Sequence, residues 1–225
     1  MSGSQEIRSQ IASIQNTQKI TKAMEMVAAS KMKKAQDQMI KARPYAEKIS
    51  NVISHLAHAH PEYTSEFFAT REVKKKGYII ISSDRGLCGG LNNNLFKLVV
   101  ETIEEDNKSD IKPAFSLIGS KATSFFQRMG GDVMAQTAQL GDKPQIEQVL
   151  GLIKSTIDSF ISGEIDQVYL VYNKFLNTVS QEPTLQKVLP IQTEVKDDNY
   201  DHYWDYLYEP DAETVLESLF TRYIE

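Results

Sequence analysis

The chain has 225 residues, of which 41% are apolar and 24% are charged, and its formal net charge is −5. This composition is typical of a globular protein, and no apolar run approaches the ~20 residues that a membrane-spanning helix needs. The single cysteine, Cys88, excludes an internal disulfide framework. The first residues show no signal-peptide pattern, so a cytosolic protein is expected.

Charge is divided unevenly along the chain. Residues 1–60 contain nine Lys or Arg and four Asp or Glu, whereas residues 61–225 contain sixteen and twenty-six. A basic segment therefore precedes an acidic body, an asymmetry that usually concerns binding partners. His55, His58 and His60 lie close together without an acidic or thiol neighbour at ligand spacing, which favours a helix end over a metal site.

Residues 1–60 are expected to form one long helix. From Gln5 to about His58 there is no glycine and a single proline, Pro44, which predicts a local bend or a lost hydrogen bond. A helix of this length would measure roughly 80 Å, so we expect it to protrude or to lie along a large partner. Small and apolar residues recur at steps of four and three, which is the seam of a coiled coil. This seam comprises Ala28, Met32, Ala35, Met39, Ala42, Ala46, Ile49, Ile53 and Leu56.

The seam loses its register near the start of the helix. Extended backward, it meets three polar residues, and the apolar residues around them lie on a shifted stripe. The polar residues are Gln18, Thr21 and Glu25, and the shifted stripe is Ile20, Met24 and Val27; the seam recovers at Ile14, Ile11 and Ile7. A stutter in a coiled coil and a stretch that faces a second partner both explain this pattern.

The lysines of the same helix admit several partners. Solvent or an acidic protein surface fits them best, because no aromatic residues or DNA-reading motif accompany them as nucleic-acid binding would require.

An α/β domain is expected over residues 77–208, after a polar linker at 61–76. Strands are predicted at 77–83, 114–119, 133–140 and 166–177, and helices at 91–106, 120–130 and 144–163. Residues 180–191 are expected to pair with the preceding strand as a hairpin. This alternation implies a Rossmann-like, mostly parallel sheet with flanking helices, in addition to the protruding N-terminal coiled-coil helix.

The stretch SSDRGLCGGLNNN at 82–94 joins the first strand to a helix. Its glycines at 86, 89 and 90 match neither the dinucleotide fingerprint nor the P-loop. A tight turn is therefore favoured over a nucleotide site, although anion binding at the helix N-terminus stays open. Cys88 has no histidine nearby in sequence and is a weak thiolate candidate. No catalytic, cofactor-binding or metal-binding residue is predicted.

Residues 194–213 combine eight acidic residues with five aromatic ones. A disordered acidic tail would lack the aromatics, so a docked loop or a contact surface is expected, with packing against the sheet as the alternative. A new helix is predicted from Pro210.

Three stretches together carry a family resemblance. Each closely resembles a segment of the gamma subunit of bacterial F-type ATP synthase. The three stretches are IRSQIASIQNTQKITKAMEMVAASKMKKAQ (7–36), SSDRGLCGGLNNNLF (82–96) and WDYLYEPD (204–211). The resemblance implies a central rotor shaft, itself not catalytic, that couples rotation of the c-ring to conformational changes at the catalytic sites of the beta subunits. Nucleotide-binding α/β enzymes and nucleic-acid-binding coiled-coil adaptors are the other classes that the residues alone leave open.

The resemblance also implies partners and contact residues. Three alpha and three beta subunits, the epsilon subunit and the c-ring are the expected partners, with no cofactor, nucleic acid or small-molecule substrate. Contact with the beta subunits is expected at Lys19, Lys22, Met24, Lys31, Lys33 and Lys34, and contact with epsilon and the c-ring at Tyr206, Tyr208 and Glu209. The expected location is the cytoplasmic face of the bacterial inner membrane, as a peripheral subunit.

One difference from the family concerns the C-terminal side. Family members continue with the returning helix of the shaft, of which residues 209–225 are expected to be the start. The chain is therefore expected to be C-terminally incomplete relative to the family.

Overall fold

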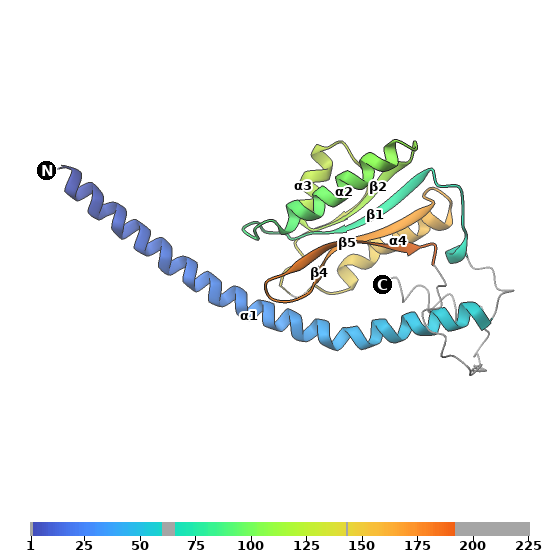
Figure 1. Cartoon of the computed structure of the whole chain (residues 1–225), viewed down its shortest axis with the longest axis horizontal. Helices are drawn as coiled ribbons and strands as arrows, with labels where there is room; N and C mark the ends of the chain where they lie inside the picture. Colours follow the sequence, from blue (N-terminus) through green and yellow to red (C-terminus); the bar gives the residue numbers. More distant parts are fainter. Residues whose placement is uncertain (1, 60–65, 143, 192–225) are drawn as a thin grey trace. The chain divides into compact units, whose positions relative to one another are not determined.

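The computed structural model describes residues 2–59, 66–142 and 144–191. The chain forms two compact units, Met1–Lys48 and Ile49–Glu225. The first element, α1 (Ser2–Ala59), is one uninterrupted helix (Figure 1), which confirms the predicted long N-terminal helix. Pro44 lies inside α1 without ending it. Because proline has no N–H, the carbonyl of Ile40 loses its intrahelical donor at this point.

The second unit is built on a sheet that has five strands within the described residues, in the order β3-β2-β1-β4-β5. The strands are β1 (Lys75–Ile81), β2 (Lys112–Ile118), β3 (Asp132–Thr137), β4 (Gln167–Phe175) and β5 (Gln181–Leu189). The first four run parallel, and β5 pairs antiparallel with β4. The predicted mostly parallel sheet and its closing hairpin are thus confirmed.

Helices cover both faces of this sheet, as predicted. They are α2 (Leu91–Asn107), α3 (Ser120–Arg128) and α4 (Glu147–Ile161). On one face Leu95 and Val99 of α2 and Phe126 of α3 pack with Tyr78 and other sheet residues in one buried cluster. On the opposite face α4 packs in a second cluster (Figure 1). Since both faces are covered, residues 77–80 of β1 and 114–118 of β2 are buried without interruption.

Three polar contacts secure the amino end of the sheet. The Lys76 ammonium and the Tyr78 hydroxyl both donate to the carboxylate of Asp106, at the end of α2, over 2.5 Å each. The side chains of Lys76 and Asp106 are only 15% and 12% exposed. Burial and the bond to Asp106 raise the pKa of Tyr78 well above its ordinary value. Lys75 forms an ion pair with Asp132 over 2.9 Å.

These contacts explain where the strand boundary differs from the sequence pattern. β1 begins at Lys75, before the apolar run at 77–83, because Lys75 and Lys76 find acidic partners at the sheet edge. A short 3-10 helix, η1 (Glu66–Phe68), precedes it and buries Phe67, within a segment that reads as polar. α4 begins at Glu147, three residues after the proline at 144 that was expected to open it.

Candidate functional site

The residues predicted to contact other subunits divide between α1 and the C-terminal segment. Lys19, Lys22, Met24, Lys31, Lys33 and Lys34 all lie on α1 and are all exposed. Met24 keeps 54% of its surface accessible. Tyr206, Tyr208 and Glu209 lie outside the described residues, as does the whole of 194–213.

Many large apolar side chains of α1 are exposed. Ile7, Ile11 and Ile14 of the seam are 58%, 49% and 68% exposed. Ile20 and Val27 of the shifted stripe are 61% and 55% exposed. Rows of exposed apolar side chains mark interaction surfaces, and a helix in water gains most of its stability from packing such a face. We therefore take both stripes as surfaces for partners.

The coiled-coil seam further along α1 has mixed burial. Ala28, Met32, Ala35 and Ala42 are exposed, Met39 is half-buried and Ile49 is buried. Ala46, Ile53 and Leu56 belong to the part of α1 whose side chains are outside the described set. Small residues at these positions leave room for the close approach of a second helix.

The register break coincides with a shallow groove along α1. Thr17 and Thr21 donate their hydroxyls to the carbonyls four residues earlier, at 3.0 and 2.9 Å. These side chains are thereby folded against their own backbone. Gln18 and Glu25 line the same groove with them. With Ser13, Ile14 and Lys22, these residues make the lining of the groove mostly small and polar.

The turn after β1 is organised by Asp84. One oxygen of its carboxylate accepts hydrogen bonds from the backbone N–H and the hydroxyl of Ser120 and from the N–H of Gln139, all at 2.9 Å. The other accepts the N–H of Leu140 at 3.1 Å. The bond from Gln139 is the main cause that lowers the pKa of the Asp84 carboxyl below its ordinary value; partial burial opposes it, and the bonds from Ser120 and Leu140 add to the lowering.

Asp84 therefore joins three loops at the carboxyl edge of the sheet. In doubly wound folds this edge is the usual place for ligands, and a helix N-terminus there favours anions. Here the Asp84 carboxylate accepts the backbone N–H and the hydroxyl of Ser120, the first residue of α3. Gly119, with φ +97°, permits the close approach, since a Cβ would clash with the Ser82 carbonyl. This geometry supports the interpretation of 82–94 as a structural turn.

The structural role of Asp84 was not predicted from the sequence. The available signal is an acidic residue directly after a strand of a predicted parallel sheet. Cys88 itself has neutral polar neighbours: the Asn92 amide donates to its sulfur at 3.3 Å, and the Ser83 hydroxyl lies 3.9 Å away. These contacts point to a packed thiol.

Two further findings concern the part of the chain that the structure describes. None of its helices combines the length and the apolar character needed to cross a bilayer. No group of three His, Cys, Asp or Glu side chains there is arranged to hold a metal ion.

Known proteins similar to this chain agree with one another. Residues 3–225 match the family model described as ATP synthase. The ATP synthase gamma chains of Nitrosococcus oceani and Pasteurella multocida are each 52% identical to it over 227 residues, covering 100% of this chain and 78% of the relative. A chain in the central stalk and c-ring structure of the Tetrahymena thermophila mitochondrial ATP synthase is 23% identical, with a TM-score of 0.61, and covers 91% of this chain and 87% of that one. At this identity the structural likeness supports the fold alone.

Proposed function

Because this chain belongs to the family of ATP synthase gamma chains, we propose that it works as the central rotor shaft that couples c-ring rotation to the beta-subunit catalytic sites. As a stalk subunit it is not catalytic. The observation that carries the proposal is α1, a helix of 58 residues that presents exposed lysines and two exposed apolar stripes. Such a surface is suited to partners that surround a shaft.

The partners follow from that role. The three alpha and three beta subunits surround the shaft, and the epsilon subunit and the c-ring bind at its foot through Tyr206, Tyr208 and Glu209. The seam beginning at Ala28 packs against the returning helix. As the relatives are bacterial proteins, the complex lies at the cytoplasmic face of the inner membrane, with this chain as a peripheral subunit.

The lysines of α1 are suited to transient contacts. A lysine is a strongly hydrated point charge on a flexible stem, and attraction between exposed charges is weak and screened by salt. Lys31, Lys33 and Lys34 can therefore hold an acidic loop of one beta subunit and release it as the shaft turns. Apolar contact at Met24 adds adhesion without a fixed hydrogen-bond geometry.

Native mass spectrometry of the complex from its own membranes tests the rotor role. One copy of this chain with three alpha and three beta subunits is the expected composition. A free monomer or a homodimer that carries a nucleotide would contradict the proposal.

A coupling assay tests the contact residues. We expect the triple variant Lys31→Gln, Lys33→Gln, Lys34→Gln to weaken the beta contact by about 1–2 kcal/mol at low salt, since exposed pairs contribute about 0.5 kcal/mol each. ATP-driven proton pumping per ATP hydrolysed should fall in inverted membrane vesicles. The matched control is Lys108→Gln, Lys112→Gln, Lys154→Gln, which changes exposed lysines of the α/β unit by the same charge. Equal pumping ratios in the two variants would refute the assignment.

A further inference from the structure

The segment that leads from α1 into the sheet is fastened to the α/β unit at several points. Phe67 is buried in the core cluster on the α4 face. Its carbonyl accepts the backbone N–H of Ile191 at 2.9 Å. Ile191 lies just after β5 and packs against the same cluster. The two segments that connect the α/β unit to the rest of the chain, 66–71 and 189–191, are therefore hydrogen-bonded to each other.

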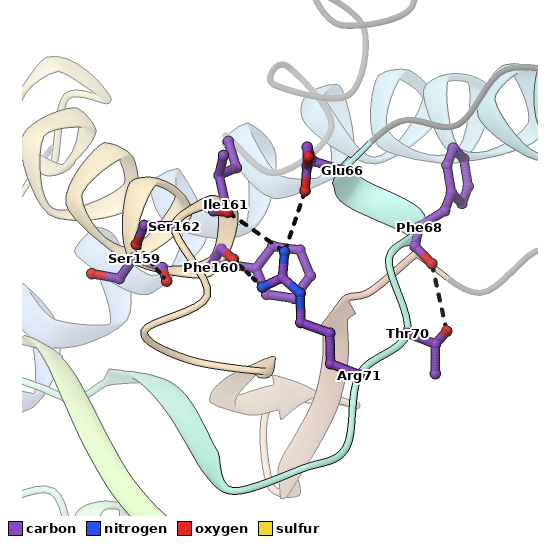
Figure 2. A network of polar contacts seen from close by, with 8 residues as sticks. All are labelled: Glu66, Phe68, Thr70, Arg71, Ser159, Phe160, Ile161 and Ser162. Atoms are coloured by element: carbon purple, nitrogen blue, oxygen red, sulfur yellow. Dashed lines mark hydrogen bonds and ion pairs between the residues drawn. The ribbon is translucent and has the colours of Figure 1, made fainter.

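Arg71 forms a second fastening, shown in Figure 2. Its Nη1 donates to the carbonyl of Phe160 at 2.6 Å, and its Nη2 lies 3.5 Å from the carbonyl of Ile161. Nη2 also pairs with the Glu66 carboxylate at 3.2 Å. The guanidinium carbon lies 5.2 Å from the centre of the Phe160 ring. One side chain thus joins η1, the linker and the last turn of α4, which is 89 residues away in sequence.

Capping does not account for this arrangement. α4 already ends in a left-handed Gly163 with φ +76°. Gly163 donates its N–H to Phe160 and Glu164 donates to Ser159, at 3.1 and 2.9 Å. These bonds satisfy the carbonyls of Phe160 and Ser159 as in other glycine-terminated helices. Arg71 adds a second donor to a carbonyl that already has one, so its particular contribution is the bridge to the linker.

A third fastening lies at the start of β1. The Asp166 carboxylate accepts the backbone N–H of Lys74 and of Lys75, at 2.8 and 2.9 Å. The linker is therefore held at Phe67 and Phe68, at Arg71 and at Lys74. Because Arg71 is the middle point, it divides the linker into two short stretches.

We propose that Arg71 is a positioning residue of the rotor, which stiffens the connection between shaft helix and α/β unit so that torque passes without extension of the linker. The inference rests on the proposed rotor function. Phe68 also packs against the core cluster, so without Arg71 the longest stretch between two such contacts grows from 68–71 to 68–74, from three peptide units to six. The mean-square excursion of a flexible segment scales with its length, so it should roughly double.

Single-molecule measurements on the complete ATP synthase test this inference. With the alpha and beta subunits immobilised and a probe on the c-ring, the angular variance of the stalled rotor reports torsional compliance. Arg71→Ala should raise that variance, up to roughly twofold if the linker dominates compliance. Arg128→Ala is the control, because the Nε of Arg128 bonds to Ser124 within its own helix, and it should leave the variance unchanged.

A second variant keeps the test decisive if Arg71→Ala does not assemble. Arg71→Lys keeps the charge but loses the fork that reaches Glu66 and α4 together, so it should give a smaller rise. An assembled Arg71→Ala or Arg71→Lys rotor with unchanged variance would overturn the inference. Absence of ATP-driven rotation in the wild-type complex would instead refute the rotor function itself.

Discussion

Replacing Asp84 by Asn should loosen the carboxyl edge of the sheet. The carboxylate accepts four hydrogen bonds from two other loops, and a hydrogen bond to a charged group contributes about 1.5–3 kcal/mol. Asn retains one oxygen without charge and turns an NH₂ group toward the Leu140 N–H or toward the Ser120 donors. Because the site is half-buried and water can replace part of the loss, we expect destabilisation of about 2–4 kcal/mol at neutral pH.

The pH dependence gives this prediction a sign. The folded-state pKa of Asp84 is lowered, so the stability that it contributes is complete above the ordinary aspartate value of about 4. It is lost as the pH falls through the lower folded-state pKa, because the unfolded chain takes up the proton first. The difference in unfolding free energy between wild type and Asp84→Asn should therefore be complete at pH 7 and shrink below about pH 4.

Urea unfolding followed by near-ultraviolet circular dichroism measures this gap, since aromatic residues fill the core of the α/β unit. Glu104→Gln, an exposed acid on α2, is the charge-matched control. A gap that is the same at pH 7 and at pH 3, or no larger than that of Glu104→Gln, would refute the reasoning.

Two other substitutions test the packing of the same unit. Gly119→Ala should destabilise it by about 3–5 kcal/mol, because a Cβ would meet the Ser82 carbonyl at a φ that favours glycine. The control Gly141→Ala, at a position with φ +76° and no atom within 4 Å, should destabilise it by only about 1–2 kcal/mol. Equal urea midpoints for the two variants would count against the clash. Asp106→Asn should lower the unfolding free energy by about 2–4 kcal/mol, because it leaves Lys76 buried without its counter-charge. Adding Lys76→Met should recover part of this loss in a double-mutant cycle. Strictly additive effects of the two substitutions would contradict the pairing.

Much of the fold was predictable because its elements carry local patterns. The apolar run of β1 and the helical spacing of Leu95, Val99 and Ile103 on α2 predict a buried strand and a packed helix, and both are present. Gly163 ends α4 as its position in the sequence predicted. These signals depend on neighbours within a few residues, so they survive without knowledge of tertiary contacts.

Contacts between distant segments had no such signal. Phe67 stands in a polar stretch, and its burial depends on α4 and β5. Arg71 meets carbonyls 89 and 90 residues away, and Asp84 meets loops 36 to 56 residues away. A side chain whose partners are backbone groups of remote turns leaves no periodicity in the sequence. The contact residues assigned to other subunits remain predictions, because the residues that would meet them belong to other chains.

The exposed stripes of α1 also have a consequence before assembly. Ten large apolar side chains of this helix are at least 40% exposed, and such surfaces favour aggregation in a protein without its partners. Newly made copies in excess of the subunits that enclose the helix should therefore be bound by chaperones or degraded. The cellular amount of this chain would then follow the supply of the surrounding subunits.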